Sequence, residues 1–202
     1  MAAFDFYDAG ALRQVATNLF YGWGYNFYRV ENQLRADDQL VRAKAAWLLG
    51  VAMASVDAAE IEYRREFLPA PSRAKPFPYA AAVASAQHLE RLARSIGALE
   101  ATILHQPVPE NDRMTQRYRQ EAPTLVTLIE HDHQLVGQCD LLRSMVDQKD
   151  GASILQRAAA LESGLEAIQS TLHKREAVLH AAAGRYAGGL PPALGQSNQR
   201  GL

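Results

Sequence analysis

The final third of the chain carries an apolar repeat that fits a long helix. Between residues 154 and 179, apolar side chains recur at alternating spacings of three and four. This spacing lines them along one side of a helix, and a sustained seven-residue repeat is typical of a left-handed bundle or coiled coil. The repeat consists of Ile154, Ala158, Leu161, Leu165, Ile168, Leu172 and Leu179, with Arg175 as its one polar interruption. We expect one helix here, from about Ala152 to Tyr186.

Four other segments show the same three-and-four spacing, and proline and glycine residues separate them. They predict helices over about 8–34, 37–67, 79–105 and 123–146. A proline ring cannot continue a helical hydrogen-bond ladder, so the proline-rich connection 69–78 ends the second helix. Pro123 suits the first turn of the fourth helix. The short turn at 148–151 makes the last two helices antiparallel neighbours.

These segments predict an all-α fold, an antiparallel, up-and-down bundle of four to five long amphipathic helices. A chain of 202 residues suffices for one sizeable core, so we assign residues 1–187 to a single domain. The alternative is a shorter pair of helices packed on a dimer partner, since long heptad seams often continue across a subunit interface. Residues 188–202 lose all periodicity and are rich in Gly, Pro, Gln and Ser, which predicts a disordered tail.

Charge and cysteine content narrow the possible classes of protein. The formal net charge is −1, from 21 basic and 22 acidic residues, whereas nucleic-acid-binding proteins normally have a basic excess. The single cysteine, Cys139, excludes an intramolecular disulfide and a zinc site built from cysteines. The sequence begins without a basic and apolar leader, and its longest strongly apolar stretch, Ala45–Val56, is too short to cross a bilayer. We expect a cytoplasmic protein with no nucleic-acid partner and no membrane insertion.

Aromatic residues are concentrated in one short segment of the first predicted helix. Residues 20–28 contain six aromatics, although the whole chain is only 8% aromatic. At this density the aromatics cover every side of a helix, and two interior glycines weaken it unless a close approach requires them. The segment is a crowded core layer, a contact surface for a protein partner or a second copy, or a small-molecule pocket. The candidate residues are Tyr21, Trp23, Tyr25, Phe27 and Tyr28.

A second candidate site lies in the fourth predicted helix, where Glu130 and His133 form a Glu-x-x-His pair. This spacing puts a carboxylate and an imidazole on one helix face, as in di-iron carboxylate bundles. If the chain turns at residue 150, His173 and Glu176 come nearly level with this pair, which suggests a mixed site for iron, zinc or manganese. The chain contains no second Glu-x-x-His pair, however, and a solvent-exposed histidine cluster is the simpler interpretation. Asp132 falls on the apolar stripe itself and requires a partner, because burying an unpaired charge is costly.

Sequence signatures of catalysis are absent. The chain lacks a Gly-x-Gly-x-x-Gly loop, a Walker sequence and a Gly-x-Ser-x-Gly elbow. Cys139 on an apolar stripe is typical of a small core residue. The preferred hypothesis is therefore a non-catalytic, self-associating helical bundle without a cofactor, acting through protein contacts as an adaptor, accessory or assembly factor. The alternative is a metal-binding oxidoreductase or sensor.

Overall fold

The computed structural model describes residues 5–21, 34–73, 76–106 and 122–187, and every regular element within these ranges is an α-helix. The elements in the first half are α1 (Ala9–Tyr21), α2 (Leu34–Phe67) and α3 (Ala80–His105). Those in the second half are α5 (Ala122–Val146), α6 (Gly151–Gln156) and α7 (Ala158–Ala187). The prediction of an all-α fold is confirmed. In the described ranges, the apolar part of each helix is too short for it to span a membrane.

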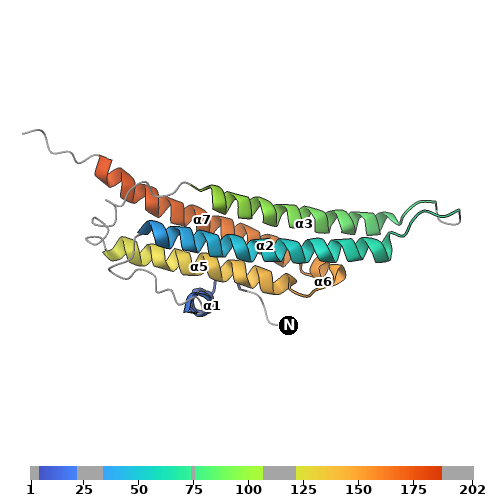
Figure 1. Cartoon of the computed structure of the whole chain (residues 1–202), viewed down its shortest axis with the longest axis horizontal. Coiled ribbons are helices and arrows are strands. Elements are labelled where there is room, and N and C mark those ends of the chain that lie inside the picture. Colours follow the sequence, from blue (N-terminus) through green and yellow to red (C-terminus); the bar gives the residue numbers. More distant parts are fainter. Residues whose placement is uncertain (1–4, 22–33, 74–75, 107–121, 188–202) are drawn as a thin grey trace, which may run out of the picture.

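Four long helices form the body of the molecule, and they alternate in direction along the chain (Figure 1). One antiparallel pair consists of α2 and α3, and the other consists of α5 and α7. The two pairs are joined laterally because α2 also packs against α5, and α3 packs against α7. The arrangement is an up-and-down bundle, as the sequence predicts.

The apolar seams predicted from the sequence form the core of this bundle. The α3 seam, from Leu89 to Ile103, is buried, and so are Leu161, Ile168 and Leu172 on α7. Small residues also contribute, since Ala45 and Ala52 of α2 are fully buried and let neighbouring helices approach closely. Because the α7 seam is covered by its own chain, a partner subunit is not needed to bury it.

The structure corrects the prediction of one continuous helix over 152–186, because the helix is interrupted at one residue. Arg157 separates α6 from α7 and has a backbone φ of −107° and ψ of 5°. Its backbone N–H donates to the carbonyl of Ile154 at 3.0 Å, a tighter turn than the α-helix makes. Its guanidinium donates to the carbonyl of Met145 at 3.1 Å, so the side chain holds this corner against the end of α5.

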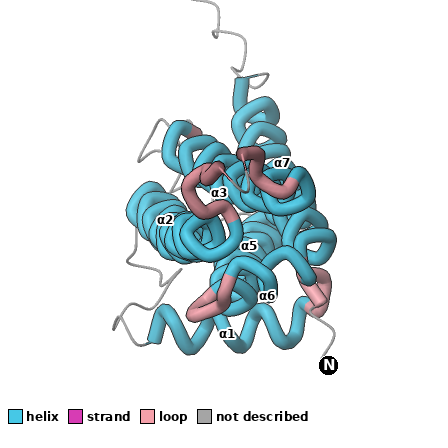
Figure 2. Tube along the Cα trace, turned by 90° about the vertical axis from the view of Figure 1, so that its right-hand side faces the viewer, coloured by secondary structure: helices cyan, strands magenta, loops and turns pink. Residues whose placement is uncertain are grey.

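The first helix also differs from the expectation of one long bundle member over 8–34. The structure describes it as α1, which ends at Tyr21, and residues 22–33 lie outside the described ranges. Instead of running along the bundle, α1 crosses the outer side of α5, as Figures 1 and 2 show from two directions. Asp8 acts as its N-cap and accepts hydrogen bonds from the backbone N–H groups of Gly10 and Ala11.

Candidate functional site

The two polar residues that interrupt the α5 and α7 seams are paired with each other in the core. Asp132 is 2% exposed and Arg175 is 1% exposed, and the Arg175 Nε donates to Asp132 Oδ1. The sequence indicates that Asp132 needs a partner, but it does not identify Arg175. The signal that could have found it is that these two residues are the interruptions of two seams on antiparallel neighbours.

Histidines lie on either side of this ion pair in the sequence of α5. Burial is the main cause that lowers the pKa of both His131 and His133 below the usual 6.5. The positive charge of Arg13 on α1 lowers the pKa of His133 further. The Nδ1 atom of His133 is shielded from solvent and makes no hydrogen bond to the described part of the chain. Burial therefore favours the neutral form of both imidazoles.

The structure does not gather the four residues of the hypothetical metal site. Glu130 and His173 are exposed, and His133 is partly buried. Glu176 lies 3.5 Å from His180 on its own helix. Among the described residues, no three His, Cys, Asp or Glu side chains are placed to hold one metal ion. The described side chains thus add no geometric support for the iron, zinc or manganese alternative.

Close packing fixes α1 against α5 at Gly137. A β-carbon added to Gly137 would lie 2.5 Å from the carbonyl oxygen of Leu12, which is far inside van der Waals contact. Glycine is thus needed there so that the α1 backbone can approach α5. On α1 the anchoring side chains, all buried, are Leu12, Ala16 and Phe20.

The segment before α1 is held by a second glycine. Phe6 is buried, and a β-carbon added to Gly164 of α7 would lie 2.5 Å from its ring. The side-chain amide of Gln138 on α5 donates to the Phe6 carbonyl oxygen at 2.8 Å. Phe6 therefore occupies a seat formed jointly by α5 and α7. Sequence reasoning missed it because Phe6 precedes the first helix and belongs to no periodic stripe.

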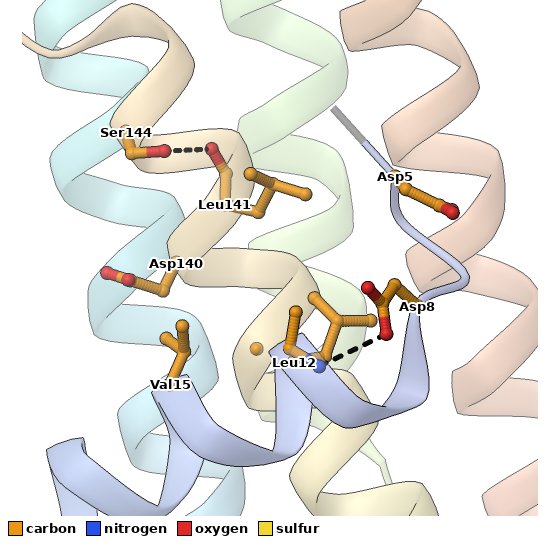
Figure 3. A pocket seen from close by; sticks show the side chains of 9 residues that line it. Asp5, Asp8, Leu12, Val15, Asp140, Leu141 and Ser144 are labelled. Carbon is orange, nitrogen blue, oxygen red and sulfur yellow. Dashed lines mark hydrogen bonds between the residues drawn. The ribbon is translucent and has the colours of Figure 1, made fainter. Parts of the chain in front are cut away.

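A hollow of about 250 Å³ lies where α1 crosses α5 (Figure 3). Three of its lining residues are acidic, but each carboxylate already has a local partner. Asp5 accepts a hydrogen bond from the backbone N–H of Tyr7 at 2.8 Å, and Asp8 caps α1. Asp140 pairs with Arg143 at 2.9 Å. Each of these carboxylates is thus engaged within its own segment of the chain.

The two most exposed aromatic side chains of the described residues, Phe77 and Tyr79, lie where α2 passes into α3, close in sequence to the partly exposed Phe67. Phe77 is 85% exposed, Tyr79 is 75% exposed and Phe67 is 44% exposed. The connection between the two helices contains four prolines at 69, 71, 76 and 78, and proline restricts the backbone. The Phe67 ring lies 4.5 Å from that of Tyr63, which supports it. We call Phe67, Phe77 and Tyr79 the aromatic tip; the α2–α3 end that carries it projects beyond α6 in Figure 1.

Most of the aromatic segment that the sequence favours as an interface lies outside the described ranges. Of its candidate residues, Tyr21 ends α1, and Trp23, Tyr25, Phe27 and Tyr28 lie outside the described ranges. Comparison with protein-family models, curated proteins and solved structures gives no significant match.

Proposed function

We propose that this is a non-catalytic helical-bundle protein that acts through protein–protein contact, and that it associates with itself through the aromatic tip. The observation that carries the proposal is the exposure of Phe67, Phe77 and Tyr79 at one end of the molecule. Aromatic side chains are enriched at the energetic centres of protein interfaces. An exposed apolar patch of this kind is a common mark of an interaction site.

The apolar area of the tip fits the core of a small interface. A fully covered aromatic side chain buries about 150–250 Å², so the three exposed fractions together offer about 400 Å² per copy. A stable interface buries about 800 Å² on each partner, and its rim is polar. Charged residues on the last turns of α2 can supply such a rim around the aromatic centre.

The charges beside the tip favour a second copy as the partner. The final turns of α2 carry both signs, with Glu60, Glu62 and Glu66 next to Arg64 and Arg65. Arg64 already pairs with Glu60 and, at 3.1 Å, with Glu90 of α3. Two such ends meet without the like-charge repulsion that a surface of one sign would produce. The proposal includes a cytoplasmic location, which is compatible with a chain whose single cysteine, Cys139, is buried as a free thiol.

The test is a comparison of two double variants by light scattering and sedimentation over a wide concentration range. The tip variant is Phe77→Ser with Tyr79→Ser. The control variant is Leu104→Ser with Val126→Ser, which removes two apolar side chains that are each 53% exposed elsewhere on the bundle. We expect the unmodified protein and the control to self-associate and the tip variant to remain monomeric with an unchanged melting temperature. A strictly monomeric unmodified protein, or equal association of both variants, contradicts the proposal.

A further inference from the structure

The outer side of α2 carries almost no charge along most of its length. Between residues 43 and 61 the exposed positions are apolar, with Asp57 as the one charged exception. The exposed side of α3 is more typical of a solvated helix, since it carries Glu90, Arg91 and Arg94. On its packed side α2 contacts α3, α5 and α6, and in Figure 2 it forms one edge of the bundle. The outer side of α2 is thus apolar although the other described helices leave it exposed.

These apolar residues repeat at the spacing of a seam that pairs helices. Trp47, Ala54 and Ile61 are spaced by seven residues, and Val51 and Ala58 each follow one of them by four. A seven-residue repeat places them along one side of the helix, as in helices that pair with another helix. We call Trp47, Val51, Ala54, Ala58 and Ile61 the α2 face. Its pattern resembles that of the buried seams of α3 and α7, but it points away from the core.

The α2 face has a large exposed side chain at each end and small residues between them. Trp47 is 54% exposed and Ile61 is 55% exposed. The Lys44 ammonium lies 4.1 Å from the centroid of the Trp47 ring, which holds the ring in place while it stays accessible. The alanines at 54 and 58 are exposed and allow another helix to approach closely. The face can therefore receive a second helix along its whole length.

The α2 face leads along the helix to the aromatic tip. The next member of its seven-residue repeat is Leu68, which is partly exposed and follows Phe67 of the tip. The backbone N–H of Leu68 donates to the Arg64 carbonyl at 2.9 Å, so the helical turn continues to this point. In Figure 1, α2 runs without a break to the end that carries the tip. The face and the tip are thus consecutive on one helix.

The apolar area of the tip is too small for a stable dimer, and the α2 face supplies the difference. The tip offers about 400 Å² per copy, which is half of what each partner of a stable interface buries. The exposed fractions of Trp47 and Ile61 offer about 200 Å² together, and the alanine and valine surfaces bring the α2 face to about 400 Å². A second copy that covers both surfaces therefore reaches the size of a stable interface.

We propose that the contact through the tip continues along the α2 face, so that two copies lie side by side with their α2 helices parallel. This inference rests on the proposed function, because contact between the two tips sets the orientation. An antiparallel pair would place the tips at opposite ends of the dimer. In the parallel pair each residue of the face meets its counterpart, so Ala58 lies against the partner's Ala58. The charges agree with this pairing, since Arg65 of one copy comes within one turn of the partner's Glu62.

Cross-linking through a single introduced cysteine tests this arrangement. In the parallel pair the two thiols of Ala58→Cys are neighbours, and a short bismaleimide links them. In an antiparallel pair centred on Ala54, Ala58 would lie opposite the partner's Gly50, about 12 Å along the axis from the partner's Ala58. Ala98→Cys on the exposed side of α3 is the matched control for random collision. The native Cys139 is buried, and burial raises its pKa, so it does not compete for the reagent.

A charge placed on the α2 face measures its contribution to association. Ala54→Glu puts two like charges opposite each other in the parallel pair, whereas Ala98→Glu adds the same charge to the exposed side of α3. Both variants replace an exposed alanine by another good helix former, so the fold is retained, and circular dichroism checks this. In sedimentation we expect Ala54→Glu to weaken dimerisation by about ten-fold or more, and Ala98→Glu to leave it unchanged.

We expect Ala58→Cys to cross-link several-fold more than Ala98→Cys, and to lose this excess when Phe77→Ser and Tyr79→Ser are also present. If the protein dimerises through the tip, but Ala58→Cys links no better than Ala98→Cys and Ala54→Glu has no effect, the inference is overturned while the proposed function stands. Cross-linking of Ala58→Cys that survives loss of the tip also overturns it, because the face then pairs independently of the tip. A protein that stays monomeric at every concentration contradicts the proposed function, and this inference with it.

Discussion

Removing the Arg175 charge is expected to destabilise the bundle severely, because the buried Asp132 carboxylate then loses the guanidinium that pairs with it. Both side chains are almost wholly inaccessible to solvent. Breaking a buried ion pair by removing one partner costs about 3–5 kcal/mol. In a domain of about 200 residues each kcal/mol lowers the melting temperature by about 2–4 °C. Arg175→Met should therefore lower the melting temperature by about 6–20 °C.

The measurement is urea unfolding followed by circular dichroism, together with calorimetric melting. Arg94→Met is the matched control, since Arg94 pairs with Glu90 at 2.6 Å but its side chain is 70% exposed. An exposed pair contributes at most about 1 kcal/mol. Asp132→Leu combined with Arg175→Met removes both charges and should recover most of the lost stability. If Arg175→Met costs no more than Arg94→Met, or if the double variant is the least stable of all, the reasoning is refuted.

Three other predictions concern the docked segment, pH and metals. Gly137→Ala should detach α1, because its β-carbon meets the Leu12 carbonyl, and hydrogen exchange should speed up in α1 while the bundle amides stay protected. The folded-state pKa values of His131 and His133 lie below 6.5, so the unfolded chain binds more protons between those values and 6.5. Their contribution to stability should be fully present above pH 6.5 and lost as pH falls through the folded pKa values, and His133→Gln should flatten this dependence in urea titrations. Dialysis against a chelator should leave the melting temperature unchanged, and elemental analysis should find no stoichiometric metal; a metal-dependent melting temperature would favour the sensor alternative instead.

The helices were predictable because their apolar spacing is regular and each long seam faces a single core. On α5 the stripe runs through Leu128, Leu135, Cys139 and Leu142, and all four are buried. Asp132 and Arg175 stood out in the sequence as interruptions of their seams, and the structure shows that they pair with each other. The apolar periodicity therefore identified each of the two charged residues separately, but not their pairing.

The crossing of α1 over α5 was not predictable from the same pattern. A stripe through Leu12 and Ala16 indicates that one face of the helix is buried, but it does not say against which helix or at what angle. In the sequence nothing distinguishes Gly137 from any other residue inside a helix, and only the structure shows that the Leu12 backbone packs against it. The seat of Phe6 is formed by two helices that are far from Phe6 in the sequence, and no local sequence pattern indicates that Phe6 packs against them.

The charged pair between α5 and α7 also affects the axial register in which these two helices pack. A heptad seam repeats itself, so sliding α7 along α5 by seven residues keeps apolar side chains opposite apolar side chains. The same slide separates Arg175 from Asp132 inside the core, and breaking a buried ion pair is costly. We infer that this pair fixes the axial register of α7 against α5, which the heptad repeat alone leaves open. A bundle without this pair would retain its helices and much of its core, but α7 could pack against α5 in more than one axial register.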